Sequence, residues 1–139
     1  MNTETRSWSE TLVAVVDLPP ARSSKEGAME MDSYTLVLRR RGPRALDFSD
    51  DELRELQAQH LAHLDAMREQ GHMLVGGPFD DQPDESLRGM SLFRTDLEET
   101  RRLAEADPSV QAGRLTVDVM TWFTKKGELA FPRAERGQQ

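Results

Sequence analysis

His60 and Asp107 are the residues of this sequence whose types and positions best suit chemistry. His60 lies in the stretch 49–71, which has the pattern of an amphipathic helix. Its apolar residues recur at three- and four-residue steps, namely Leu53, Leu56, Leu64 and Met67. At about 100° per residue, His60 falls in the middle of that apolar face. A titratable ring aimed at the core is unusual, because a buried polar group must find a partner there.

Asp107 is predicted to lie at the C-terminal end of a second helix and to face its apolar side, with Leu97, Thr100, Leu103 and Ala104. If Asp107 reaches His60, the carboxylate would fix the imidazole tautomer and support acid or base chemistry at the other ring nitrogen. The alternative is that Asp107 merely ends its helix and His60 is a satisfied core histidine. The residue types alone leave both interpretations open.

Two further segments are candidates for ligand binding. Gly76, Gly77 and Pro78 end a predicted strand, and they either allow a ligand close to the backbone or simply make a bend. Arg39 belongs to a basic cluster with Arg40, Arg41 and Arg44. That cluster is either a solvated loop or a site for a carboxylate or phosphate group.

The sequence predicts neither a cofactor nor a metal. His63 and His72 raise the question of metal, but no metal-binding motif surrounds them. The acidic loop 80–85 lacks the spacing of a calcium loop, and the glycines do not form a nucleotide-binding pattern. The absence of cysteine excludes thiolate metal sites and cysteine nucleophiles.

Composition narrows the class of protein. The chain has 139 residues, enough for one domain with its own core, and a net charge of −7. Nucleic-acid binders usually rely on clustered Lys and Arg, so no nucleic-acid partner is expected. No apolar run is long enough to span a membrane, and the N-terminus lacks a secretory signal. Together with the absence of cysteine, these features predict a cytoplasmic protein.

The predicted elements alternate in a recognisable order. Ser49 and Glu52 have capping-box spacing at the start of the first helix, and Gly71 ends it. Thr95 and Glu98 repeat that spacing in the second helix. Strands are expected at 34–40, 73–79, 89–94 and 114–124. The β-α-β-β-α-β order predicts a ferredoxin-like α+β fold: a four-stranded antiparallel sheet with both helices on one face.

The other face of such a sheet needs a cover, and a second copy in a homodimer is the economical one. The domain is expected to span 34–126. Residues 1–33 are predicted to be a weakly ordered N-terminal extension, and residues 127–139 a polar C-terminal tail.

Three motifs together resemble the YciI-like (YCII-related domain) family. They are Gln59–Leu64, Leu74–Pro78 and Ala106–Gly113, within a resemblance spanning roughly residues 34–124. The resemblance implies a dimeric α+β barrel formed by two copies. It also implies an active-site histidine at His60, an aspartate at Asp107 and a Gly-Pro turn at Gly77 and Pro78.

These observations lead to two hypotheses. In the first, the protein is a small cofactor-independent lyase or isomerase acting on a small cyclic or aromatic metabolite. His60 would move a proton, Asp107 would orient it, Gly76 and Gly77 would give the substrate room, and Arg39, Arg40 or Arg41 would neutralise a substrate carboxylate. In the second, the protein is a non-catalytic dimeric module that binds a small molecule in the same pocket or serves an accessory role.

Overall fold

The structure, a computed structural model, describes residues 30–131. The extension expected over residues 1–33 therefore lies almost wholly outside the described residues, as does the end of the predicted tail. The described residues form two compact units, one made of 34–122 with Phe131 and one made of 30–33 with 123–130. In the smaller unit, the Lys126 amide donates to the Glu30 carbonyl at 2.9 Å.

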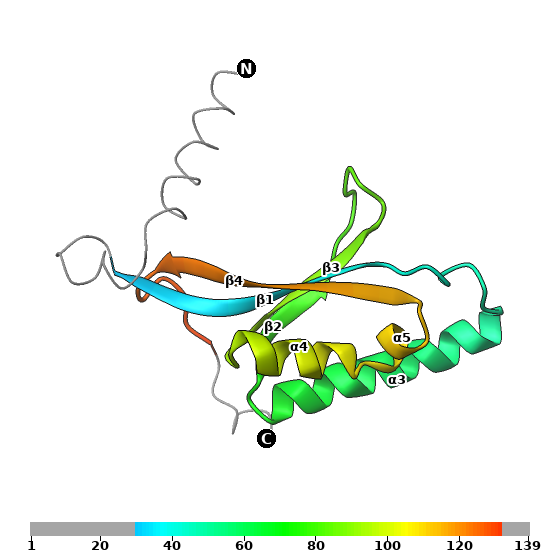
Figure 1. The fold of residues 1–139 in the computed structure, drawn as a ribbon, viewed down its shortest axis with the longest axis horizontal. Coiled ribbons are helices and arrows are strands. Elements are labelled where there is room, and N and C mark those ends of the chain that lie inside the picture. The colour runs from blue at the N-terminus through cyan, green and yellow to red at the C-terminus, as the bar shows by residue number, and fades with distance from the viewer. Residues whose placement is uncertain (1–29, 132–139) are drawn as a thin grey trace, which may run out of the picture. The chain divides into compact units, whose positions relative to one another are not determined.

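A four-stranded sheet organises the chain (Figure 1). Its strands are β1 (Met31–Arg41), β2 (Met73–Pro78), β3 (Leu87–Phe93) and β4 (Leu115–Lys125). Their order across the sheet is β2-β3-β1-β4, and β3 runs antiparallel to both β1 and β2. The predicted ferredoxin-like α+β fold is confirmed. The strand predicted to start at Tyr34 begins three residues earlier.

The long helix α3 (Asp50–Glu69) forms as its end signals predict. The Ser49 hydroxyl accepts the Glu52 amide at 3.2 Å, and the Glu52 carboxylate accepts the Ser49 amide at 2.8 Å. These reciprocal bonds satisfy amides that have no partner within the helix. Gly71, with φ of +82°, takes the left-handed conformation that ends the helix. The prediction for this helix is confirmed at both ends.

The second helix begins and ends at other residues than predicted. It is α4 (Leu97–Glu105), and its N-cap is Asp96, whose carboxylate accepts the Glu99 amide at 2.8 Å. The predicted cap at Thr95 is wrong because its hydroxyl is bonded to that of Thr100 at 2.6 Å. Leu97, predicted to face inward, is 39% exposed.

A one-turn helix, α5 (Pro108–Gln111), follows α4 and was not predicted. Asp107 is the N-cap of α5 rather than the last residue of the preceding helix. Pro108 cannot continue the preceding helix, but proline is favoured in the first turn of a helix, and here it begins α5.

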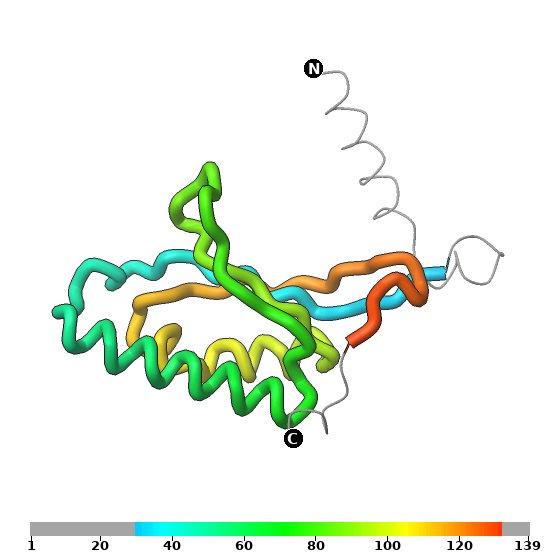
Figure 2. Tube along the Cα trace, turned by 180° about the vertical axis from the view of Figure 1, so that it is seen from behind, coloured from blue at the N-terminus to red at the C-terminus, as the bar shows by residue number. Residues whose placement is uncertain are grey.

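The core lies between the helices and one face of the sheet. Figures 1 and 2, seen from opposite sides, both place α3 and α4 along the same face. The buried core residues are Val37, Met67, Met73, Phe93, Leu103 and Ala104. Side chains alternate along a strand, so residues next to these in sequence point to the opposite face. This alternation decides which strand residues can reach a site under the helices. No helix within residues 30–131 is long and apolar enough to span a membrane.

Candidate active site

His60 and Asp107 meet through a short hydrogen bond. His60 Nδ1 lies 2.6 Å from Asp107 Oδ2, and the exposed fractions of the two side chains are 12% and 3%. A carboxylate can only accept, so Nδ1 carries the proton and donates it. The pair joins α3 to the start of α5, and the acceptor position of the ring is therefore Nε2.

The second oxygen of Asp107 is held by the backbone. Oδ1 accepts the amide of Ser109 at 2.8 Å, which is the N-cap bond of α5. Pro108 occupies the first turn of this helix, where its fixed φ is already helical. Both carboxylate oxygens thus have defined partners, and the carboxylate has little freedom to rotate away from His60.

His60 lines a pocket of about 380 Å³ between α3, the sheet and the start of β4. Its Nε2 has no hydrogen-bond partner among the described residues, so this nitrogen is available to a bound molecule. The pocket is also lined by Arg39, Gly76, Gly77, Pro78, Arg88 and Arg114. An oriented imidazole with a free nitrogen at a pocket can accept or donate a proton.

Arg39 is the buried cation of this pocket, with 6% of its surface exposed. Its Nη1 donates to the Ser91 hydroxyl at 2.8 Å. Within residues 30–131, no carboxylate forms an ion pair with it. Burial lowers the pKa of Arg39, while the nearby charge of Asp107 partly opposes this by favouring the charged form. A desolvated guanidinium with one neutral acceptor can bind an anionic oxygen.

The glycine segment forms another part of the wall, and its two glycines differ. A Cβ on Gly76 would lie 2.4 Å from the Ser91 hydroxyl oxygen, closer than any real contact of this kind. A Cβ on Gly77 would meet nothing within 4 Å. Gly76 therefore makes room for the serine that holds Arg39, while Gly77 leaves open space at the pocket. Pro78 lines the same pocket.

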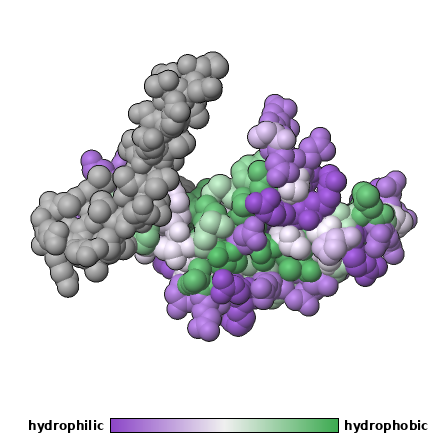
Figure 3. Space-filling model, turned by 45° about the horizontal axis from the view of Figure 1, so that its top comes forward, coloured by the Kyte–Doolittle hydropathy of each residue, from purple (hydrophilic) through white to green (hydrophobic). Residues whose placement is uncertain are grey.

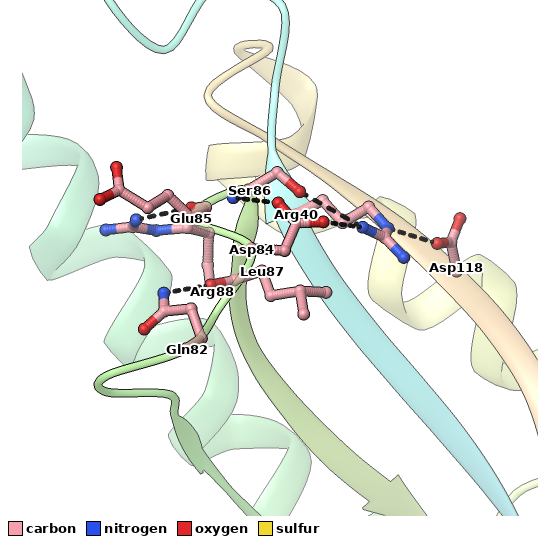
Figure 4. Close-up of polar contacts among 8 residues, drawn as sticks. All are labelled: Arg40, Gln82, Asp84, Glu85, Ser86, Leu87, Arg88 and Asp118. Carbon is pink, nitrogen blue, oxygen red and sulfur yellow. Dashed lines mark hydrogen bonds and ion pairs between the residues drawn. The ribbon is translucent and has the colours of Figure 1, made fainter. Parts of the chain in front are cut away.

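The other arginines of the basic cluster do not reach this pocket. Arg40 lies on the opposite side of β1 from Arg39, and its Nε donates to Asp118 at 2.9 Å (Figure 4). Arg40 Nη1 also donates to the hydroxyl of Ser86 at 3.3 Å, at the end of the acidic loop. In that loop, the Ser86 backbone amide and hydroxyl lower the pKa of Asp84, with a smaller effect from Arg40. This loop is thus tied to β1, whose Arg40 also binds Asp118 on β4.

His63 is structural rather than chemical. Its Nε2 lies 2.9 Å from the Leu103 carbonyl oxygen, so the ring links α3 to α4. Among the described residues, no three His, Asp or Glu side chains are grouped as metal ligands.

Sequence reasoning missed four polar residues of the site, namely Arg88, Ser91, Ser109 and Arg114. Ser91 contacts Arg39 across 52 residues of sequence, so no local pattern could identify it. Ser109 does have a local signal. Aspartate is a preferred N-cap residue, and its carboxylate accepts the backbone amide two or three residues later, so Asp107 followed by Pro108 points to the amide of Ser109. Arg88 and Arg114 stand outside the basic cluster and lack any local signal.

Comparison with known proteins identifies the domain. A family model described as YCII-related domain matches residues 34–123. Among solved structures, the chain is similar to 5-chloro-2-hydroxyhydroquinone dehydrochlorinase from Burkholderia phenoliruptrix AC1100, in complex with 2,5-dihydroxybenzoquinone. The identity is 24%, the TM-score is 0.47, and the match covers 64% of this chain and 92% of the dehydrochlorinase chain. No curated protein matches the sequence.

Proposed function

This chain belongs to the YCII-related domain family, and we propose that it is a cofactor-independent enzyme that moves a proton on a small anionic molecule. The observation that carries the proposal is the 2.6 Å bond between His60 Nδ1 and Asp107 Oδ2, which leaves Nε2 free at the pocket. A general base must be oriented and must reach its substrate. His60 has both properties.

The proposed reaction begins with removal of a proton by His60. Nε2 takes a proton from a carbon next to a carbonyl group, and the electron pair of the broken C–H bond forms the C=C bond of an enolate. The carbonyl π electrons move to oxygen, whose negative charge Arg39 stabilises. The imidazolium that forms at His60 is stabilised by the carboxylate of Asp107. The aspartate of a catalytic triad stabilises its histidine in the same way.

The enolate has two outcomes. In an isomerase acting on a substrate with a conjugated C=C bond, Nε2–H gives the proton to the far carbon of the dienolate, so that the C=C bond moves as the carbonyl re-forms. In a lyase, the carbonyl re-forms, the C=C electron pair of the enolate becomes a double bond to the neighbouring carbon, and the group on that carbon leaves with its electron pair and takes the proton from Nε2–H. Small cyclic and aromatic molecules with a carbonyl or acidic hydroxyl group fit the size of the pocket.

The test is proton exchange with solvent. Wild-type protein is incubated in D₂O with lactones and hydroxylated, chlorinated ring acids, and deuterium entry into each compound is followed by NMR. We expect exchange with wild type and a loss of about 100-fold or more in His60→Gln, the usual size of a general-base contribution. His63→Gln is the matched control, because His63 lies on the same helix but bonds to Leu103.

Equal exchange by wild type and His60→Gln would refute the proposed role of His60. Binding of the compounds with no exchange in wild type would instead favour a non-catalytic module that uses the same pocket.

We also propose that the functional unit is a homodimer that buries the sheet face opposite the helices. The neighbours of the inward-facing Val37 and Ser91 point to that face, and all four are apolar: Leu36, Leu38 and Met90 are half-buried, and Leu92 is buried. Val75 pairs with Leu92 and is 47% exposed, while Met120 and Trp122 on β4 are each 40% exposed. Figure 3 turns this side forward and shows apolar residues gathered between polar ones.

An exposed apolar surface of this kind usually marks an interface. A second copy is the occupant favoured by symmetry, because the same patch then covers itself across a two-fold axis.

A further inference from the structure

Arg88 and Arg114 lie between two hollows of the surface. Both line the pocket that contains His60 and Arg39, and both also line a smaller hollow of about 180 Å³. The smaller hollow adds Arg41 to its wall. The two arginines therefore stand at the mouth of the candidate active site, away from the buried guanidinium of Arg39.

The contacts of Arg88 and Arg114 leave their charges without a compensating carboxylate. Arg88 donates to the backbone carbonyl of Glu85 at 3.1 Å, and Arg114 donates to Oε1 of Gln57 at 3.2 Å. Both acceptors are neutral. Within residues 30–131, no ion pair includes either arginine. Figure 4 shows Arg88 extending away from Arg40, which forms ion pairs with Asp84 and Asp118.

Arg68, in the same pocket, differs because its charge is paired with a carboxylate. It also lines the pocket, but its Nη1 lies 3.1 Å from the Asp65 carboxylate, one turn earlier on α3. Arg68 is thus already neutralised by the chain itself. Of the three arginines that line this pocket besides Arg39, only Arg68 has an acidic partner among the described residues.

We propose that the pocket binds a small dianion, with one anionic group on Arg39 beside His60 and a second, a carboxylate or a phosphate, on Arg88 and Arg114. The place of the first group rests on the proposed function, whereas the second subsite rests on the two arginines alone. Guanidinium groups bind carboxylate and phosphate through paired N–H donors, so two of them match one such group.

Charge and size both favour a compact dianion. Arg88 and Arg114 line the same pocket, so their like charges repel, and an anion bound by both would reduce that repulsion. The positive wall would also draw anions from solution to the pocket mouth. The pocket volume, about 380 Å³, is near the lower end for small-molecule sites. The ligand is therefore one ring or one short chain with two acidic groups.

The experiment measures binding of matched diacids and monoacids to the full-length protein by calorimetry. The probes are succinate, glutarate, phthalate and isophthalate, each compared with its own monomethyl ester, which keeps the skeleton and removes one charge. A parallel titration uses 3-phosphonobenzoate. Comparing its affinity with that of isophthalate shows whether the second subsite prefers a phosphonate or a carboxylate. We expect at least one dianion to bind ten times or more tightly than its monoanionic partner.

The variants test where the second charge is recognised. In Arg88→Gln with Arg114→Gln, the preference for the dianion should fall below about threefold, while Arg68→Gln should retain it. Each single variant is measured as well, so that misfolding of the double variant does not decide the result. A wild type that does not distinguish diacids from their esters would overturn the proposal, as would a preference that survives loss of both arginines.

The same titrations on His60→Gln separate this inference from the proposed reaction. The dianion preference should persist in that variant, because the second subsite does not involve the imidazole. Preference without proton exchange in wild type would leave the subsite standing and reject the reaction. Exchange without preference would reject the subsite alone.

Discussion

The Cα of Gly76 faces the hydroxyl of Ser91 so closely that an added methyl group would lie 2.4 Å from its oxygen. The same hydroxyl accepts the Nη1 donor of Arg39 at 2.8 Å. A glycine on β2 therefore fixes the position of a cation on β1 through a serine on the strand between them.

Gly76→Ala should disturb this arrangement, and Gly77→Ala should not. The methyl group at position 76 must push Ser91 aside, and overpacking of this kind typically costs about 1–3 kcal/mol. At position 77 it would meet nothing within 4 Å. Urea denaturation of the two variants checks the prediction, together with their affinity for a monocarboxylate that Arg39 would bind. Equal losses in both variants would contradict it.

Asp107→Asn should preserve α5 but reverse the tautomer of His60. The Ser109 amide is a fixed donor, so the asparagine oxygen must face it and the NH₂ group must face Nδ1. Nδ1 then accepts, and Nε2 carries the proton and cannot act as a base. Asparagine is as good an N-cap as aspartate, so stability should change little.

We expect proton exchange by Asp107→Asn to fall by about 100-fold or more, the size of a general-base contribution. Nitrogen chemical shifts of the His60 ring report the tautomer directly. If Nε2 remained unprotonated in this variant while exchange was lost, the tautomer explanation would be wrong.

Arg39→Met should make the protein more stable and weaken anion binding. Burial lowers the pKa of Arg39, which means that the folded state disfavours its charge. Replacing a buried charged group with an apolar one of similar size is often stabilising, here by roughly 1–2 kcal/mol. Arginine stays charged throughout the accessible range, so the gain should be the same from pH 6 to pH 9.

Thermal denaturation of Arg39→Met at several pH values, with and without a bound monocarboxylate, measures both effects. A lower melting temperature would show that the guanidinium stabilises the fold rather than serving a ligand.

Met120→Lys should shift the protein from dimer to monomer. Met120 is 40% exposed on the outer sheet face, where a charge would be buried against a second copy. Leu97→Lys is the matched control, since Leu97 is 39% exposed but lies on α4, on the other side of the sheet. Analytical ultracentrifugation distinguishes the two states. A monomeric wild type, or equal dissociation of both variants, would contradict the proposed interface.

Local sequence signals explain why most of the fold could be predicted. The capping box of Ser49 and Glu52 and the glycine at position 71 act within a few residues, and both behave as their spacing indicates. Competition between neighbours is harder to predict. Thr95 and Asp96 can each cap α4, and the bond between the hydroxyls of Thr95 and Thr100, five residues apart, decides in favour of Asp96.

The candidate site was harder to predict than the fold, because it depends on contacts between residues far apart in the sequence. His60 could be singled out because a polar residue interrupts a periodic apolar face, which is a local signal. Its orientation by Asp107 is a contact between residues 47 positions apart in the sequence, and the Ser91 contact of Arg39 joins residues 52 positions apart. Arg88 and Arg114 become distinctive only when their partners in space are known to be neutral.

The brevity of α5 has a consequence for how the protein responds to heat. A four-residue helix cannot persist by itself, because so short a segment gains too few internal bonds to offset its lost conformational freedom. Its first turn depends on Asp107, and opening of that turn would release the carboxylate from His60. Local opening needs less energy than global unfolding. Hydrogen exchange at the α5 amides should therefore rise at a lower temperature than in the sheet, and any activity should disappear with it.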